Sequence, residues 1–432
     1  MNLNLIISLG VLAFMIVSFM IHKISYGLTA MICVAILAIT GVITPETAFS
    51  GFSTTATVTC MCMIVVAGAI NKTSLMGSIK SWIAKKQAGK GIFFVALVCL
   101  AVPLLTQFMG MTALIAFMLV LVSTLNDEDD VNPARMIFLV AAISCAWTGK
   151  FPIGMGAVYP LSTNALYTGL VNDNPEYLIG MFDILKIGAI PAVVLTIYCF
   201  FAWRLLPKTK LDASAMAGAE KKPAKEIVSN PKQDRLIYII FTVVMLCFVF
   251  SNQLGKLLYV IPFVAILVLI LTKVFTPEEA IRMLTSDMMW MIAGVQVISA
   301  AMGTSGAADL VGNFIMNLLG GNPSPLMVLV VFAVATTILT NFMYNTGCSA
   351  VMTPIAASTA LACGMNPKTV VLVVFCSTLF AIALPTGSVA ATLAFAIGRY
   401  EPVKCFKFTI PFLILGIISL VVSAMLLFPI YM

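Results

Sequence analysis

Charged residues are scarce in this sequence. Asp, Glu, Lys and Arg make up 9% of its 432 residues, whereas hydrophobic residues make up 61%. A soluble globular domain carries about 25% charged residues, so this chain has too few to cover a water-exposed surface. Several apolar runs approach about 20 residues, the length that a helix needs to cross a bilayer. The composition therefore excludes a soluble globular domain and predicts an all-α polytopic membrane protein.

Metal-binding and catalytic side chains are also few. His22 is the only histidine, and Cys60 and Cys62 lack the two-residue gap of a zinc or redox pair. The sequence has no His-Glu-x-x-His motif, no aspartate pair inside an apolar run and no serine–histidine pairing. These absences argue against an intramembrane enzyme, and we expect no cofactor and no metal beyond sodium.

The net charge of +7 does not indicate nucleic-acid binding. Nearly all Lys and Arg residues lie in loops between apolar runs, where they set the orientation in the membrane. Their bias predicts both termini outside and a polar cytoplasmic linker at 207–234. The segment Lys72–Lys90 is expected to form an amphipathic helix along the inner face of the membrane. We expect a multi-pass protein of the cytoplasmic (inner) membrane that has a lipid bilayer and not a nucleic acid as partner.

Ten apolar runs are expected to span the membrane. They cover residues 4–22, 27–43, 53–71, 136–170, 182–206, 235–252, 256–274, 286–304, 369–398 and 405–430. Two of them, 136–170 and 369–398, are long and contain Gly, Pro and hydroxyl residues near their middle. Interrupted helices of this kind free backbone groups at membrane depth, where they face a cavity or other protein.

Two further apolar stretches, 92–125 and 325–362, are broken by small and polar residues at Thr106–Thr112 and Thr340–Gly347. Each arm has about 15 residues, or about 22 Å of helix. That is shorter than a hydrocarbon core of about 30 Å. We therefore predict two re-entrant hairpins whose tips mark a site. The alternative is two ordinary spans joined by a tight turn.

Similar motifs recur in both halves of the chain. Pro45–Ala48 and Pro277–Ala280 each precede a span, a polar helix and a hairpin, and an Asn-Pro pair (Asn132, Asn366) follows each hairpin. Five spans per half is an odd number, so two copies must lie upside down to one another. We predict two inverted repeats, 1–206 and 235–432, with a substrate site at their interface.

The interruptions carry the chemistry of an ion site. Asn345-Thr346 and Thr386–Ser388 supply uncharged oxygens for sodium, and amides, hydroxyls and helix ends for an anion. Carboxylates are nearly absent from the apolar runs, which favours sodium over protons as the coupling ion. Lys150 lies about 15 positions into a span, so its ammonium is expected to face the site.

These residues resemble the divalent anion/sodium symporter family, within the wider ion-transporter group that includes arsenite and sodium/proton carriers. Thr340–Ile355 is similar to the family's Ser-Asn-Thr hairpin tip, with Tyr344 in place of Ser. Leu384–Ser388 is similar to its Leu-Pro-x-Ala-Thr break, Asn132–Gly154 resembles the matching first-half helix, and Pro45–Ser53 is similar to a stretch near the start of such proteins. The likeness extends over most of the chain.

The resemblance implies two half-sites that hold sodium ions and a carboxylate or sulfate, and an elevator movement in a homodimer. Together with Lys150, it predicts two sets of site residues. The predicted substrate-binding residues are Thr112, Lys150, Asn345, Thr346 and Ser388. The predicted sodium ligands are Gly154, Thr340, Asn345 and Gly387.

The first half departs from the family pattern. Met111 stands where the tip asparagine is expected, and Met155 replaces the Ser or Thr of the break. A thioether cannot replace a hard oxygen ligand of sodium. We therefore hypothesise that the Lys150 ammonium stands in for the first sodium ion. A second alignment instead places Ser162–Asn164 at the break.

The sequence as a whole predicts a secondary transporter that couples sodium to symport of a di- or tricarboxylate or sulfate. The alternative is an anion exchanger or a sodium-independent carrier of the same fold in which Lys150 replaces a sodium ion. A non-transporting receptor or scaffold would need a sizeable soluble module, and 207–234 is too short and too polar to be one.

Overall fold

The computed structural model describes residues 3–21, 23–70, 72–73, 92–108, 111–122, 130–172, 174–210, 231–249, 260–318, 320–321 and 323–431. The described residues are almost entirely helical, and their only strand-like pairing is one antiparallel bridge between Met365 and Tyr431. Most of the predicted amphipathic helix Lys72–Lys90 and most of the predicted linker 207–234 lie outside these ranges, as does the tip of the first hairpin at 109–110.

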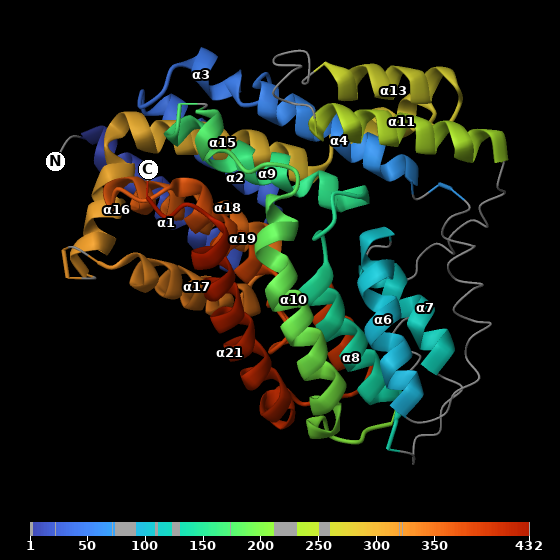
Figure 1. Ribbon diagram of the computed structural model, residues 1–432. Coiled ribbons are helices and arrows are strands. Elements are labelled where there is room, and N and C mark those ends of the chain that lie inside the picture. Colours follow the sequence, from blue (N-terminus) through green and yellow to red (C-terminus); the bar gives the residue numbers. More distant parts are fainter. Residues whose placement is uncertain are drawn as a thin grey trace.

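The first half of the chain forms helices where the apolar runs predict them (Figure 1). Its elements are α1 (Leu3–Ile21), α2 (Tyr26–Ile39), α3 (Pro45–Ser50), α4 (Thr55–Ile70), α6 (Ile92–Phe108), α7 (Met111–Val122), α8 (Pro133–Trp147), η1 (Gly154–Ala157), α9 (Tyr159–Tyr167), η2 (Thr168–Leu170), η3 (Pro175–Tyr177), α10 (Asp183–Ala202) and η4 (Trp203–Leu205).

The second half continues in the same order. Its elements are α11 (Pro231–Val249), α13 (Ile261–Leu271), α14 (Pro277–Leu284), α15 (Asp287–Ser305), α16 (Ala307–Leu318), α17 (Pro325–Phe342), α18 (Asn345–Ala362), α19 (Pro367–Thr378), α20 (Val389–Ile397) and α21 (Pro402–Leu427). Both long spans are interrupted, between α8 and α9 and between α19 and α20.

The recurring motifs start corresponding helices. Thr44 caps α3 and Thr276 caps α14, and each is followed by proline at the first helical position. Asn132 and Asn366 cap α8 and α19 in the same way, with a side-chain oxygen that accepts backbone N–H groups. An oxygen-bearing N-cap followed by proline is a strong local start signal. The motifs thus fix helix starts at matching points of the two halves.

Helices at matching positions of the two halves also pack against neighbours at matching positions. The arms α6 and α7 pack on α8, and α17 and α18 pack on α19. Likewise α2 packs on α15 and α13 packs on α4, while α10 and α21 pack on each other. These pairings agree with a duplicated architecture, and the inverted orientation of the two copies stays a prediction.

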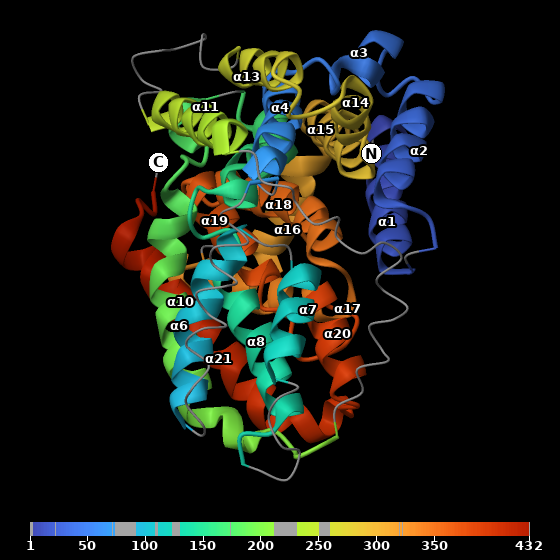
Figure 2. The same cartoon turned by 90° about the vertical axis from the view of Figure 1, so that its right-hand side faces the viewer.

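The buried hydrophobic residues form two separate cores. One contains buried residues of α6, α7, α8, α10, α17, α19, α20 and α21, and the other contains those of α1, α2, α4, α11, α13 and α15. The first group occupies the lower part of Figures 1 and 2 and the second group the upper part. Helices α9 and α18 contribute residues to both cores and therefore lie along the boundary.

The hairpin arms are longer than the sequence indicates. Helices α17 and α18 have 18 residues each, which is about 27 Å of helix, so the expected 15-residue arms are wrong for this hairpin. Only Met343 and Tyr344 separate the two helices, because Thr340 and Asn341 continue α17. That both hairpins enter and leave the membrane on the same side stays a prediction. Arm length no longer supports it for the second hairpin, so the support comes from the contacts of the hairpin tips described below.

Four of the described helical segments are long and apolar enough to cross a membrane. They are Asp183–Leu205, Pro277–Ser305, Pro325–Phe342 and Pro402–Leu427. Shorter apolar helices at six further places, from Leu3–Phe19 to Pro367–Thr378, overlap other predicted spans or the first hairpin. Helical segments of these lengths fit the polytopic architecture that the composition predicts.

Candidate functional site

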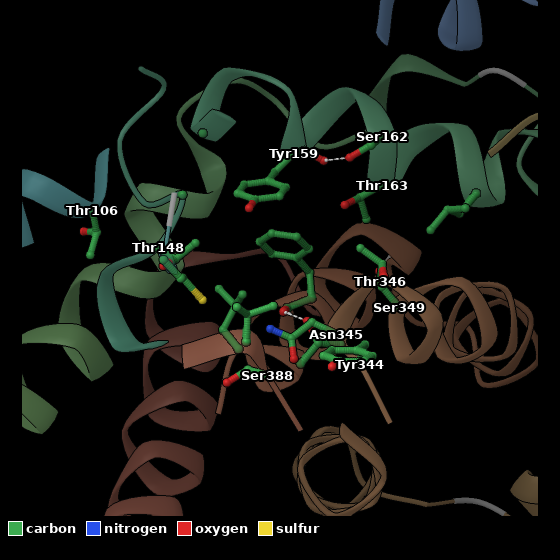
Figure 3. A pocket seen from close by; sticks show the side chains of 18 of the residues that line it. Thr106, Thr148, Tyr159, Ser162, Thr163, Tyr344, Asn345, Thr346, Ser349 and Ser388 are labelled. Atoms are coloured by element: carbon green, nitrogen blue, oxygen red, sulfur yellow. Dashed lines mark hydrogen bonds between the residues drawn. The ribbon is translucent and has the colours of Figure 1, made fainter. Parts of the chain in front are cut away.

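One cavity lies where the two hairpin tips and the two interrupted helices meet (Figure 3). Its volume is about 360 Å³. Hydroxyl, carboxamide and aromatic side chains supply the polar part of its wall. These residues are Tyr26, Thr106, Gln107, Thr148, Tyr159, Ser162, Thr163, Tyr344, Asn345, Thr346, Ser349, Thr378 and Ser388. None of the described lining residues carries a formal charge.

Four helices begin at this cavity. Met111 opens α7, Tyr159 opens α9, Asn345 opens α18 and Val389 opens α20, and all four residues line the wall. The first N–H groups of a helix have no partner within the helix, and its N-terminus carries about half a positive charge. Four such ends give a cavity without charged side chains a positive potential. This arrangement suits a small anion.

In the second half, the Asn341 carboxamide joins the hairpin tip to the interrupted helix. Its nitrogen donates to the carbonyl of Thr337 in its own helix at 2.8 Å and to that of Phe380 at 3.1 Å. Its oxygen accepts the N–H of Ala383 at 2.8 Å. The Thr386 hydroxyl donates to the Asn341 carbonyl at 2.8 Å. The Asn341 side chain therefore hydrogen-bonds both a carbonyl and an N–H group that have no helical partner where the helix is interrupted.

In the first half, the Gln107 carboxamide makes the corresponding contacts. Its nitrogen donates to the carbonyl of Pro103 in its own helix at 2.8 Å and to that of Trp147 at 2.9 Å. Its oxygen accepts the N–H of Phe151 at 3.2 Å. The same nitrogen also donates to the Thr106 hydroxyl at 3.0 Å. We call Gln107 and Asn341 the bridging carboxamides.

The bridging carboxamides were not among the predicted site residues. They are 5% and 4% exposed, and each is the last residue but one of the first arm of its hairpin. The signal was present in the sequence, because Thr106–Thr112 and Thr340–Thr346 align without a gap and place Gln107 opposite Asn341. Buried carboxamides need partners for both their donors and their acceptor, which these two find on the breaks.

Three of the predicted sodium ligands come together at the second tip. The Thr340 hydroxyl donates to the Thr378 carbonyl at 2.8 Å and lies 3.1 Å from the Asn345 carboxamide. The same end of that carboxamide lies 3.0 Å from the Thr378 carbonyl and 3.1 Å from the Gly387 carbonyl. We call Thr340 Oγ1 and these two carbonyl oxygens the oxygen cluster. All three of its oxygens can accept a hydrogen bond or bind a cation.

The remaining predicted residues of the second half also lie at the cavity. Thr346 is exposed toward it, and Ser388 lines it while being buried. The Ser388 hydroxyl donates to the Ala381 carbonyl at 2.8 Å and accepts the Ala391 N–H at 3.1 Å as the cap of α20. Ser388 therefore aims the N-terminus of α20 at the cavity. The predicted second half-site is assembled as one unit.

The first half-site is less complete. Gly154 begins the short 3-10 turn η1, and Thr148 and Gly149 of the break line the cavity. The side chain of Thr112 lies outside the described part of the structure. Met111 presents its apolar side chain where the second half has Asn345. The predicted site residues that line the cavity in the described part of the structure, Asn345, Thr346 and Ser388, therefore come from the second half.

Lys150 is 1% exposed but does not line the cavity. Its Nζ lies 3.5 Å from Sγ of Cys376 in α19, and its side-chain end packs against Gly188 of α10. A Cβ at Gly188 would lie within 2.7 Å of the Lys150 Nζ, so this glycine makes room for the ammonium. The structure therefore places Lys150 behind the cavity wall and not among the other predicted site residues.

The second alignment, Ser162–Asn164, falls partly at the cavity. Ser162 and Thr163 line it from α9. Asn164 instead accepts the Ile179 N–H at 2.8 Å and donates to the Ile179 carbonyl at 2.9 Å. Helix α9 thus adds two hydroxyl groups to the wall opposite the second tip. No cluster of three or more metal-ligating His, Cys, Asp or Glu side chains occurs among the described residues.

The chain is similar in sequence to known transporters. The sequence model of a family described as "Citrate transporter" (CitMHS) matches residues 14–260 and 252–432. An uncharacterized transporter of Haemophilus influenzae is 24% identical over 417 residues, which cover 92% of this chain and 87% of the relative.

Two further relatives match part of the chain. The uncharacterized transporter sll0640 of Synechocystis is 23% identical over 224 residues, or 52% of this chain. The uncharacterized transporter YfbS of Escherichia coli is 28% identical over 152 residues, or 35% of this chain. The matched segments span 36% and 25% of the lengths of these two relatives.

Two solved transporters share the fold. MtrF of Neisseria gonorrhoeae, from a class of antimetabolite efflux pumps, gives a TM-score of 0.57 at 13% identity, covering 92% of this chain and 86% of MtrF. YdaH of Alcanivorax borkumensis, a transporter with an unusual topology, gives 0.56 at 13% identity, covering 88% and 86%. At this identity the likeness concerns the fold alone, that of a helical membrane transporter. The predicted all-α polytopic membrane fold is thereby confirmed, and the inverted repeats stay a prediction.

Proposed function

Since the chain belongs to the citrate transporter family CitMHS, we propose that it is a sodium-coupled symporter of a small di- or tricarboxylate. Its membership of the ion-transporter superfamily was predicted from the hairpin tips and breaks, and that prediction is confirmed. The protein is therefore a membrane transporter and not an enzyme. Sodium coupling and the chemical identity of the substrate belong to the proposal.

The observation that carries the proposal is the cavity with four helix N-termini and no charged side chain among its described lining. A volume of about 360 Å³ accommodates a small polycarboxylate and falls in the usual range of ligand pockets. Hydroxyl groups of Thr163 and Thr346 line the cavity and can donate to carboxylate oxygens. Without arginine, recognition depends on hydroxyls, amides and helix ends, which also suits sulfate as a second substrate class.

The oxygen cluster supports sodium as the coupling ion. Sodium binds uncharged oxygens, and Thr340, Thr378 and Gly387 present three of them beside Asn345. An ion held there lies at the wall of the anion cavity, so each ion favours the binding of the other. This proximity is the physical basis of symport.

An elevator movement is proposed from the two hydrophobic cores. The cavity wall takes Phe375 and Leu379 from one core and Tyr26, Met291 and Ile292 from the other. A substrate between two separately packed bodies can be carried when one slides past the other. A homodimer, inverted repeats over 1–206 and 235–432, and both termini outside complete the proposal.

A second candidate is an exchanger or a sodium-independent carrier in which Lys150 replaces a sodium ion. It is favoured by Met111 and Met155, which remove two oxygen ligands from the first half-site, and by the deep burial of the Lys150 ammonium. Against it stands the contact of that ammonium with Cys376, away from the cavity lining.

A thermal-shift screen of the purified protein tests the anion proposal. A ligand that binds only the folded state raises its apparent stability by about 2.7 kcal/mol at a hundredfold excess over Kd. We expect citrate or a related carboxylate to raise Tm more in sodium chloride than in choline chloride. If no carboxylate and no sulfate raises Tm in either salt, the proposed function is wrong.

Lys150→Met distinguishes the two candidates. Under sodium symport, we expect proteoliposomes with wild-type protein to take up the anion only along a sodium gradient, and Lys150→Met to retain this dependence, because the methionine fills the same space. Replacing a buried charge with an apolar side chain of similar volume is often neutral or stabilising. Under the second candidate, wild-type uptake is independent of sodium and Lys150→Met stops it.

A further inference from the structure

The Asn345 carboxamide can fit against the oxygen cluster in two ways. We propose that it turns over when a sodium ion binds, and that this turn couples the cation to the anion. The inference rests on the proposed function and names Asn345 as the residue that links sodium binding to anion binding. It is carried by the contacts of one side chain with Thr340, Thr378 and Gly387 and by its place on the cavity wall.

With the nitrogen inward, the site is satisfied without any ion. The amide group then donates toward Thr340 Oγ1 at 3.1 Å, the Thr378 carbonyl at 3.0 Å and the Gly387 carbonyl at 3.1 Å. All three neighbours accept, so they favour nitrogen over oxygen at this position. This is the resting orientation when sodium is absent.

With the oxygen inward, the site requires a cation. Four oxygens then converge on a single proton, that of the Thr340 hydroxyl, which can be donated to the Asn345 oxygen at 3.1 Å or to the Thr378 carbonyl at 2.8 Å but not fully to both. Carbonyl and amide oxygens that face one another without a proton repel. A sodium ion removes the repulsion and takes uncharged oxygens as ligands. Sodium therefore selects the oxygen-inward orientation.

The turn changes what the other end of the carboxamide presents to the anion. Asn345 is half-buried and lines the cavity, so one end of its carboxamide faces the oxygen cluster and the other end faces the cavity (Figure 3). Without sodium, that outer end is an oxygen, which repels a carboxylate. With sodium, it is an NH₂ group, which donates to a carboxylate. Binding of the two ions is thereby linked through one rotation, and the linkage is reciprocal.

The first half of the protein lacks this device. Met111 occupies the position of Asn345 in the aligned tips, and its thioether neither donates to an anion nor binds sodium. The neighbouring Gln107 carboxamide cannot turn freely, because its oxygen accepts the Phe151 N–H while its nitrogen donates to the Trp147 carbonyl. The inference therefore assigns the coupling to a single residue, Asn345.

Asn345→Asp separates the two roles of the side chain. Aspartate keeps an oxygen for the cation but has no NH₂ group to offer the anion. We measure citrate binding to the purified full chain by calorimetry, in sodium chloride and in choline chloride at equal ionic strength. Wild type is expected to bind citrate about 10- to 100-fold more tightly in sodium. In Asn345→Asp the sodium effect is expected to fall below about twofold, while sodium alone still raises Tm.

Thr340→Val provides a second route that leaves Asn345 in place. It removes one oxygen of the cluster with little change in volume, so we expect the sodium effect on citrate binding to shrink strongly. Asn313→Asp, on the exposed side of α16, is the matched control and should keep the wild-type ratio.

The outcomes separate the inference from the proposed function. If wild type binds citrate more tightly in sodium and both Asn345→Asp and Thr340→Val keep that ratio, Asn345 does not couple the ions and the inference is wrong although symport stands. A wild type that binds citrate equally in both salts also overturns the inference and leaves a sodium-independent carrier. A wild type that binds no anion removes the proposed function, and the inference with it.

Discussion

Gly387→Ala is expected to shift sodium-coupled uptake to much higher sodium concentrations although it adds only one methyl group. A Cβ at Gly387 would lie 2.8 Å from the Thr340 carbonyl oxygen and 3.1 Å from Cα of Asn341. Both neighbours are backbone atoms of the hairpin tip, so neither can rotate away. The methyl group must separate the tip from the break and open the oxygen cluster.

The expected size of this effect follows from the cost of overpacking. Forcing extra atoms into a packed site costs about 1–3 kcal/mol. Because about 1.4 kcal/mol is a tenfold change in affinity, sodium affinity should fall by about 10- to 100-fold. Uptake of labelled citrate in proteoliposomes over a sodium titration measures it. Gly10→Ala in α1, where a Cβ meets nothing within 4 Å, is the control. Wild-type sodium dependence in Gly387→Ala would mean that the tip and the break do not form the cation site.

Replacing a bridging carboxamide with leucine should give the largest loss of stability. In Asn341→Leu, the Phe380 carbonyl and the Ala383 N–H lose their partner in a buried place. Each buried polar group left unpaired costs about 1–3 kcal/mol, so two cost about 2–6 kcal/mol of the free energy of unfolding. Gln107→Leu should also lower stability but by less, because it leaves the Phe151 N–H without its partner while the Trp147 carbonyl still accepts the Lys150 N–H at 3.2 Å.

Two comparisons make this prediction specific. Asn341→Asp keeps the acceptor for the Ala383 N–H and loses only the donor, so its Tm should fall between those of wild type and Asn341→Leu. Gln233→Leu removes an exposed carboxamide that donates to the Lys273 carbonyl at 3.1 Å, and it should leave Tm unchanged. Melting of the detergent-purified variants measures all of them. An Asn341→Leu variant with the Tm and uptake of wild type would contradict the bridging role.

Much of the architecture could be predicted from the sequence because helix starts and apolar length are local properties. The Thr-Pro pairs at Thr44 and Thr276 and the Asn-Pro pairs at Asn132 and Asn366 act within one turn of the helices that they start. In the second half, Thr340, Asn345 and Gly387 could be named as neighbours because a break and a hairpin tip both leave polar backbone groups to be satisfied.

Other features depend on packing that the sequence does not display. The direction of the Lys150 side chain is decided by the space that Gly188 leaves on α10 and by Cys376 on α19, both far from it in sequence. The arms of the second hairpin extend further than predicted because Asn341 donates back to the Thr337 carbonyl and the helix continues past its polar residues. A lone glutamine in an apolar run has no local motif, so only the alignment of Gln107 with Asn341 indicates its role.

Protection of a cysteine at position 346 tests the central claim, that the anion binds where the two tips and the two breaks meet. Thr346 lines the cavity and is exposed, whereas the described native cysteines are buried or half-buried and give a low background in wild type. Thr346→Cys should react with a small charged methanethiosulfonate reagent. Citrate with sodium, at concentrations that raise the Tm of the variant, is predicted to slow this reaction at least about tenfold, since ligands exclude reagents from the cavities they fill. An unchanged labelling rate at the same concentrations would show that the anion binds elsewhere.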